Sequence, residues 1–358
     1  MAQSLNSFDS GVFDATEREQ WKHMLFEDTQ ARTIAANRRE TEAWTRVRSV
    51  ADWERFRDER LRALRDSLGP FPSAPADLHV AVTGELPGDG FRIRKLIFET
   101  RPSLLVTAHL YLPDPLPSRM PGIQICHAHH RPKEQAELQD MGVNWARSGA
   151  AVLVPDVLGH GERAQQPFGG RQDYYSRYFI NMHFSLAGES YLAWIVWDLM
   201  RGTDLLLTLP GIDRERIILI GAVAGGGDPS AVAAAFDPRV TCSIPYNFGA
   251  GSAWRTHLRT PTPPGRNLAG IGYWELTRNL PLTARDGFFP WVLVAAVAPR
   301  YLVSAHEFEW DADKDEAWHR IQKVYDFYGA RDRLGWCKGA GACEPGPGNT
   351  HCTNVGPI

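Results

Sequence analysis

The stretch that most constrains the fold is Ile217 to Ala235, IILIGAVAGGGDPSAVAAA. Its four apolar residues at 217–220 predict a buried strand, and Ser230 to Ala235 predicts a helix. The turn between them is rich in glycine, which has no side chain beyond its α-carbon and lets a strand and a helix approach closely. We therefore expect a buried strand that passes through a tight turn directly into a helix.

Strand and helix patterns alternate along most of the chain. Residues 91–112 predict an antiparallel pair at the sheet edge, and short apolar strands are expected near 122–130, 151–155, 240–245 and 301–304. Helices are expected at 190–212 and 316–329, and Asp213 to Arg216 is expected as the turn before the strand at 217. This alternation predicts an α/β fold with a doubly wound, mostly parallel sheet.

Residues 1–75 differ from the rest of the chain. Up to about residue 68 they are polar, with apolar residues spaced three to five apart among many arginines and glutamates, and a Gly/Pro cluster follows at 69–75. We interpret 1–75 as an N-terminal helical extension, a pair of amphipathic helices packed on the main domain. A partner-binding arm is the alternative. Residues 76–358 form the expected main domain.

Composition and charge exclude several classes of protein. The 358 residues carry a net charge of -3 and no long block of like charges, which argues against nucleic-acid binding. The longest apolar run considered, Trp291 to Val297, is too short to cross a bilayer. The amino terminus lacks a secretory signal pattern, so we expect a soluble protein, cytoplasmic or exported with its signal removed. Of the five cysteines, Cys337 and Cys343 flank a glycine-rich loop and are candidates for a disulfide.

Five motifs in order resemble those of the α/β-hydrolase superfamily, and within it the acetyl xylan esterase and glucuronoyl esterase-like branch. They are CHAHH at 126–130, DVLGHGER at 156–163, the segment 197–221 leading into the glycine-rich turn, APRYLVSAHEFEWDAD at 298–313 and NTHC at 349–352. The resemblance covers roughly Phe91 to the end and implies an α/β-hydrolase fold. Fold alone does not imply function.

The resemblance places the nucleophile elbow at the opening stretch. The elbow pattern is Gly-x-Ser-x-Gly, and here the corresponding residues are Gly221, Ala222, Val223, Ala224 and Gly225. Val223 thus occupies the nucleophile position, where a serine would attack an ester carbonyl. Because valine has no nucleophilic atom, serine-type esterase activity is doubtful.

The remaining catalytic positions follow from the same resemblance. His351 lies where the family keeps its general base, after the last predicted strand. The carboxylate that orients it is expected in the loop after YLVS, at Glu307 or Glu309 rather than Asp311, and the choice between the first two stays open. The chain ends seven residues after His351, where the family continues into a closing helix, so this resemblance implies a shortened domain or a fold that closes without that helix.

The oxyanion hole requires backbone N–H donors aimed at the developing negative charge. By position these are Ala224, after the nucleophile, and Ala128 in the CHAHH loop. His127 and His129 flank Ala128 and are expected to contact substrate. Their clustering also suggests a metal site, but no HExxH-type helix supports one, so we expect no metal and no cofactor.

The rim of the site is expected from two further segments. His160 in the GHGE loop is interpreted as a residue that shapes the rim, and Tyr174 and Tyr175 belong to an aromatic segment that caps the site. Aromatic rings there could stack on a sugar or an aryl ester. The expected partner is accordingly a small-molecule or carbohydrate ester, with no nucleic acid and no membrane, and the oligomeric state is left open.

Three interpretations of Val223 remain. The chain is an esterase-like protein whose chemistry is carried by another residue or by water activated at His351, with Cys126, Ser190, Asp228 and Ser230 weighed as substitutes. Alternatively it is a non-catalytic homologue that binds a carbohydrate or ester ligand, or valine replaces a native serine through engineering. We expect weak or absent esterase activity.

Overall fold

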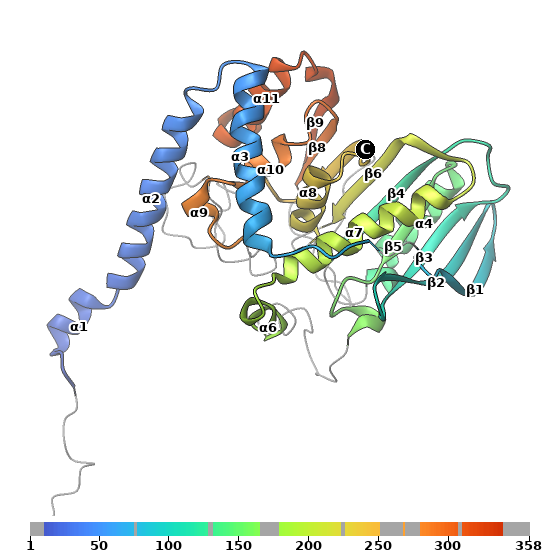
Figure 1. Cartoon of the computed structure of the whole chain (residues 1–358), viewed down its shortest axis with the longest axis horizontal. Coiled ribbons are helices and arrows are strands. Elements are labelled where there is room, and N and C mark those ends of the chain that lie inside the picture. Colours follow the sequence, from blue (N-terminus) through green and yellow to red (C-terminus); the bar gives the residue numbers. More distant parts are fainter. Residues whose placement is uncertain are drawn as a thin grey trace, which may run out of the picture.

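The central element of the structure is a mixed sheet with helices on both faces (Figure 1). The computed structural model describes residues 11–74, 77–127, 132–164, 179–222, 226–250, 268, 280–306 and 310–338. Within these residues the strand order is β1-β2-β3-β5-β4-β6-β7-β8-β9. The strands are β1 (Ala81–Gly88), β2 (Phe91–Arg101), β3 (Leu104–Pro113), β4 (Met120–His127), β5 (Ala151–Pro155), β6 (Ile212–Ala222), β7 (Cys242–Pro245), β8 (Tyr301–His306) and β9 (Leu334–Lys338).

Strand direction divides the sheet into two parts. β1, β2 and β3 pair antiparallel with their neighbours, and β3 also pairs antiparallel with β5. From β5 through β4, β6, β7 and β8 to β9 every pairing is parallel. The predicted α/β fold with a mostly parallel sheet is confirmed, as is the antiparallel pair at 91–112. Because the parallel strands share one direction, their carboxyl ends meet at one edge of the sheet.

Helices cover both faces of this sheet. They are α4 (Ala136–Arg147), α6 (Asn181–Leu186), α7 (Tyr191–Thr208), α8 (Gly227–Phe236), α9 (Thr283–Asp286), α10 (Pro290–Ala295) and α11 (Glu316–Phe327). In β6, Leu219 joins the core formed with α7, α8, α10 and α11, whereas Ile218 and Ile220 join the core formed with α4. This alternation is the period of two expected of a strand that is buried on both faces.

Three details of the sheet differ from the predictions. The expected turn at 213–216 is wrong as a separate element, because β6 already begins at Ile212 and pairs with Met120. The register then shifts so that Gly122 pairs with Ile217, and the residues between form a bulge in which the Glu215 N–H donates to the Asp213 carboxylate at 3.1 Å. The edge strand is β1 rather than the 91–112 pair, and β9 was not predicted.

The amino-terminal region comprises α1 (Ala15–Trp21), α2 (Met24–Trp44) and α3 (Val50–Leu68). Trp44, Trp53 and Phe56 from α2 and α3 surround Trp291 of α10, with ring centroids 5.0 to 6.1 Å from it. All four rings are buried, so α3 and the carboxyl half of α2 form part of the main hydrophobic core.

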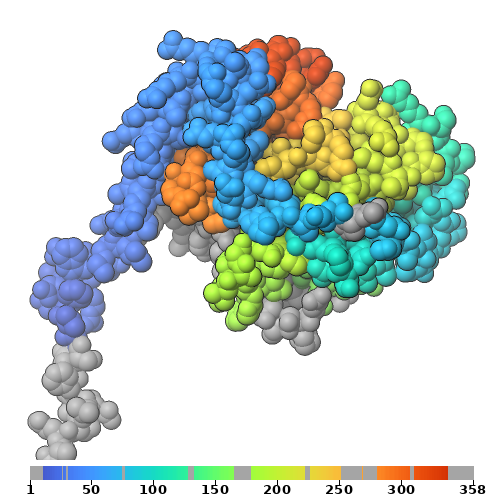
Figure 2. Space-filling model, viewed as in Figure 1, coloured from blue at the N-terminus to red at the C-terminus, as the bar shows by residue number. Residues whose placement is uncertain are grey.

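The opposite end of this region is arranged differently. Every described side chain from residues 11 to 32 is exposed, and α1 with the adjoining part of α2 stands away from the body (Figures 1 and 2). Among the described helices, none combines the length and apolarity that crossing a bilayer requires.

Candidate active site

The candidate site lies at the edge where the parallel strands end. The described strands stop there at His127 (β4), Ala222 (β6), Pro245 (β7) and His306 (β8). The sequence places its catalytic positions just beyond these strand ends, and most of them lie outside the described residues: Val223, Ala224, Ala128, His129, Glu307, Glu309, His351, Tyr174 and Tyr175. The described residues that border these positions define the surroundings of the site.

Glycine is required on both sides of the predicted elbow. A β-carbon at Gly221, near the end of β6, would lie 2.0 Å from the Ser230 hydroxyl oxygen and 2.4 Å from the Gly226 carbonyl oxygen. A β-carbon at Gly227, the first residue of α8, would lie 1.9 Å from the Tyr246 carbonyl oxygen. Because even one methyl group at either position would overlap neighbouring atoms, the strand, the turn and α8 are in direct contact. This close approach is the packing that the glycine-rich stretch predicted.

The next strand continues the same edge. The backbone N–H of Tyr246 donates to the Gly221 carbonyl at 2.9 Å, and that of Asn247 donates to the Ala305 carbonyl at 2.8 Å. Asn247 is fully buried and has a φ of 55°, a left-handed conformation that asparagine tolerates better than most residues. These bonds fix β6, β7 and β8 relative to one another where they end.

Two of the histidines predicted at the site, His127 and His160, lie in the described part of the chain, and both are buried. His127 is the last residue of β4, opposite Ala222, and is 1% exposed. The His160 side chain is fully buried, and its Nδ1 lies 3.0 Å from the Leu158 carbonyl oxygen. Since a carbonyl only accepts, the His160 proton is assigned to Nδ1. The rim-shaping role of His160 and substrate contact by either histidine stay predictions.

A buried polar network holds the loop that carries His160. The Asp156 carboxylate, directly after β5, accepts hydrogen bonds from Thr107 at 2.7 Å and from the Glu162 backbone N–H at 3.1 Å. It also forms an ion pair with Lys133, whose ammonium lies 2.6 Å from the Glu162 carboxylate. Arg163 donates to the Asp156 carbonyl at 3.1 Å, so the last two residues of the DVLGHGER loop are bonded back to its first residue.

The same loop is bonded to α7. Arg163 forms a 2.8 Å ion pair with Asp198 of α7, and Thr100 of β2 donates to the other oxygen of that carboxylate at 2.6 Å. Sequence analysis missed these partners. The sequence did contain one sign of this network. A short glycine-containing loop directly after a buried strand carries three charged residues, Asp156, Glu162 and Arg163. We call these residues, with Lys133, Thr100, Thr107 and Asp198, the loop network.

The electrostatics of the loop favour the charged forms of Lys133 and Glu162. Burial by itself lowers the pKa of Lys133, but hydrogen bonds to Asp156 and Glu162 outweigh it and raise the pKa above its ordinary value. The hydrogen bond from Lys133 in turn lowers the pKa of Glu162. Because a buried charge is tolerated only with an opposite partner, Lys133 and Asp156 depend on each other.

The end of β8 forms a second unpredicted cluster, beside the positions of the predicted acids. The His306 Nε2 lies 3.1 Å from the Ser304 hydroxyl oxygen, and the His306 ring packs on Trp310 at a centroid distance of 4.2 Å. Trp310 donates through its Nε1 to Asp315 at 2.9 Å. Asp311, the third candidate acid, pairs at the surface with Lys314 at 2.7 Å.

Three of the substitute nucleophiles considered, Cys126, Ser230 and Ser190, are not suited to that role. Burial, followed by the charges of Asp228 and Asp198, raises the pKa of the Cys126 thiol well above its ordinary value, so the reactive thiolate does not form at neutral pH. The Ser230 hydroxyl donates to the Gly227 carbonyl at 2.9 Å and packs under Gly221.

Burial also makes Ser190 a poor candidate for the nucleophile. It is the buried N-cap residue of α7, 3% exposed.

Metal binding has no support in the part of the chain that the structure describes, where no group of three His, Cys, Asp or Glu side chains could hold an ion. His129 and His130, which prompted the metal hypothesis, lie outside that part. Cys337 is not bridged to another described cysteine, and its candidate partner Cys343 also lies outside.

Comparison with known proteins identifies the same group of folds. The family model for acetyl xylan esterase matches residues 51–249, more than half of the chain. The match begins in α3 and includes the strands β1 to β7. No curated protein matches the sequence.

Solved structures agree in fold at low sequence identity. A protein assigned as an acetyl xylan esterase from Bacteroides fragilis superposes with a TM-score of 0.65 at 18% identity, over 81% of this chain and 76% of the other. A methylesterase gives 0.62 at 18% identity over 90% of this chain, which spans 65% of that protein. A glucuronoyl esterase from Solibacter usitatus gives 0.53 at 19% identity, over 79% and 83%.

Proposed function

Because the chain belongs to the acetyl xylan esterase family, we propose that it is an esterase-like protein that binds a small-molecule or carbohydrate-linked carboxylic ester. The ligand sits at the carboxyl ends of β4, β6, β7 and β8. With Val223 at the nucleophile position, the route through an acyl-serine intermediate is closed, and hydrolysis is weak or absent.

The packing around the predicted elbow is the observation that carries this proposal. Gly221 and Gly227 leave no room for a β-carbon, so β6 and α8 meet as closely as a nucleophile elbow requires. This packing supports an elbow at Val223, a residue that cannot react. A triad enzyme without its nucleophile keeps an acceleration of roughly 10³ to 10⁴ over water from its oxyanion hole and binding contacts.

A non-catalytic role is the second candidate. The loop network orders the loop after β5 through Asp156, Lys133 and Arg163, none of which is among the predicted catalytic residues. A loop held in this way beside the candidate site supports ligand binding whether or not the nucleophile is present. Under this alternative the protein binds acetylated or uronic-acid-containing sugars and releases them unchanged.

Restoring the serine tests the proposal. Hydrolysis of an activated acetate ester is compared between the unmodified chain, Val223→Ser and Val223→Ala, which shortens the side chain without adding a nucleophile. We expect Val223→Ser alone to raise the rate, by at least about a hundredfold given the cost of losing a triad serine. Adding His351→Ala to Val223→Ser should remove that gain.

Other outcomes separate the alternatives. Rapid hydrolysis by the unmodified chain, abolished by His351→Ala, would overturn the loss of activity and require another nucleophile. If Val223→Ser and Val223→Ala behave alike, the elbow assignment is wrong. Calorimetry with acetylated xylan oligosaccharides tests the binding role separately, and no heat with any of them would exclude it.

A further inference from the structure

The amino-terminal arm, residues 11–32, carries apolar side chains that the body does not cover. It comprises α1 and the first part of α2 and projects from the molecule (Figure 2). Leu25 is 73% exposed, Met24 58% and Trp21 45%, and Val12, Phe13 and, just beyond, Ile34 are also exposed. The other large exposed apolar residues are distributed over several elements of the body. Such a concentration on one projecting segment marks an interaction surface.

The arm has little to stabilise it within one chain. α1 has seven residues and none is buried. Isolated helices shorter than about 12 to 15 residues are marginal in water, because most helical stability in proteins comes from packing. Contact with another surface would supply that packing.

Charge along α1 and α2 indicates which surface the arm fits. The arm holds five acidic residues, Asp14, Glu17, Glu19, Glu27 and Asp28, against three basic ones, Arg18, Lys22 and Arg32. The arm base, residues 36–48, holds the exposed cations Arg38, Arg39, Arg46 and Arg48. Of its two glutamates, Glu40 is already neutralised by Arg60, with both oxygens at 2.8 Å. An acidic arm and a basic arm base are therefore complementary.

A hollow lies at the arm base, between α2, α3 and α9. It measures about 380 Å³, and four alanines contribute to its wall: Ala36, Ala43, Ala63 and Ala284. Arg39, Arg60 and Arg285 line it together with Glu40, Glu59 and Asp286. Small apolar side chains bordered by arginines suit an aromatic ring, since guanidinium groups pack on aromatic faces.

We propose that two copies of this chain form a symmetric dimer in which the arms lie antiparallel and the tip of each arm covers the arm base of the other. Trp21 enters the hollow beside Arg39. A two-fold axis generates two identical contacts, because each copy contributes both an arm tip and an arm base. Trp21 is the last residue of α1, and the 15 steps from Met24 to Arg39 within α2 span about 23 Å of helix. The axis then passes near Ala31, whose small side chain lets the helices cross closely.

Sedimentation velocity of the full chain over a dilution series tests the dimer. We expect dimers in the unmodified chain and a dissociation constant at least about tenfold weaker for Trp21→Glu with Leu25→Glu, since buried aromatic residues dominate interface energies. Val82→Glu, which adds a charge to an exposed apolar position on β1, is the matched control and should leave the dimer unchanged. Circular dichroism confirms that each variant is folded.

A charge exchange tests the antiparallel register. One variant carries Arg39→Glu and Arg46→Glu at the arm base, and another carries Glu17→Arg and Glu19→Arg at the tip of the arm. Each alone brings like charges together and should be monomeric, whereas an equimolar mixture should dimerise as the unmodified chain does, most strongly at low salt. A monomeric unmodified chain at every concentration overturns the proposal. So does an unchanged dimer in the Trp21 and Leu25 variant, or a mixture that stays monomeric.

Discussion

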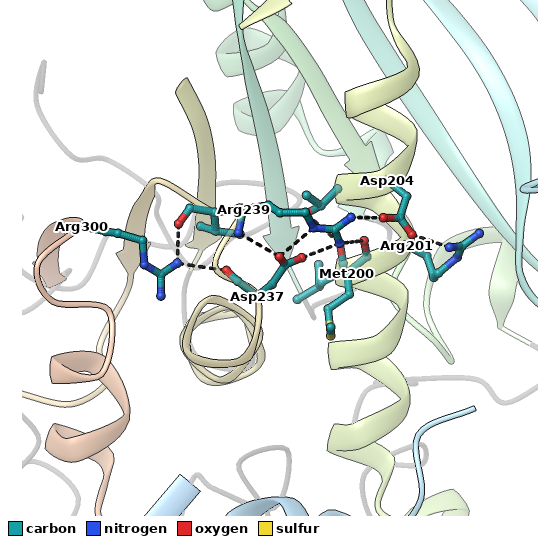
Figure 3. A network of polar contacts seen from close by, with 9 residues as sticks. Met200, Arg201, Asp204, Asp237, Arg239 and Arg300 are labelled. Atoms are coloured by element: carbon teal, nitrogen blue, oxygen red, sulfur yellow. Dashed lines mark hydrogen bonds and ion pairs between the residues drawn. The ribbon is translucent and has the colours of Figure 1, made fainter. Parts of the chain in front are cut away.

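Two polar networks attach the helix α7 to the rest of the molecule, and they differ in what surrounds their cations. In the loop network a buried carboxylate, Asp156, faces a buried cation, Lys133, which is 5% exposed. On the other side of α7, buried Asp237 accepts from Arg239 at 2.8 and 2.7 Å, but Arg239 is 40% exposed (Figure 3).

The second network, which we call the far network, extends over the surface. Arg239 also binds Asp204 of α7 and donates to the Met200 carbonyl at 3.3 Å, and Arg300 donates to the Asp237 carbonyl at 3.0 Å (Figure 3). From this comparison we expect that the burial of the remaining partner, more than the number of bonds, sets the free-energy cost of breaking a network. It also separates a network that borders the candidate site from one that does not.

The largest expected effect comes from Asp156→Ala. It leaves Lys133 buried beside only Glu162, whose side chain is 62% exposed. Breaking a buried pair by removing one partner costs about 3 to 5 kcal/mol, and we expect that loss in the free energy of unfolding measured with urea. Ester binding should weaken as well, because the loop after β5 loses its attachment. A loss below that of Asp237→Ala would contradict the comparison.

Arg163→Met should cost less, about 2 to 3 kcal/mol, the range for hydrogen bonds to charged groups. Methionine fills similar space without leaving a new buried cation, while Asp198 keeps the hydrogen bond from Thr100. Urea unfolding gives the stability, and calorimetry with an acetylated oligosaccharide gives the effect on binding. Arg163→Lys is the control and should recover part of the stability because it restores the charge.

Asp237→Ala should cost about 1 to 2 kcal/mol, since Arg239 can turn to water after losing its partner. The backbone N–H of Arg239, now bonded to Asp237 at 3.0 Å, also loses its acceptor. Ligand binding and any activity of Val223→Ser should not change. A clear change in either would show that the far network is coupled to the site, and the distinction between the two networks would fail.

The smallest effect concerns pH. The hydrogen bond from Lys133 lowers the pKa of Glu162 in the folded state. A lowered folded-state pKa contributes stability above the ordinary value of about 4.3 and loses it as pH falls through the folded value. Glu162→Gln should therefore cost a few tenths of a kcal/mol at neutral pH, because solvent screens this exposed group. The difference from the unmodified chain should vanish in strongly acidic solution, and urea unfolding from pH 7 to pH 3 measures it.

The parts of the fold that sequence predicted share a local signal. β6, α7 and α11 carry apolar residues at the period of their element, and Gly221 and Gly225 mark the turn into α8. β1 carried no such signal, because it is exposed along most of its length and contains Gly84 and Pro87. Residues 213–216 look like a turn in isolation and are incorporated in β6 only because β4 pairs on both sides of them.

Less of the candidate site than of the fold could be predicted from the sequence. The order of motifs identified the family, which is confirmed. It also predicted a site at the strand ends, and that position stays a prediction. The roles of Val223, His351 and the acid at Glu307 or Glu309 remain predictions. The loop network was not predictable, because Lys133 and Asp156 are 23 residues apart and Arg163 and Asp198 are 35 apart. No periodicity links residues at such separations, and only the packed sheet brings them together.

The sequence by itself determined the alternation of strands and helices, the glycines at the turn after β6 and the valine between them, because each follows from the size and polarity of neighbouring residues. Tertiary structure decided which charges are buried together and which end of α2 is covered. Those outcomes depend on the surfaces that distant segments present to one another. The same polar amino-terminal sequence is part of the core at Trp44 and exposed at Trp21, since only the first of these meets Trp291.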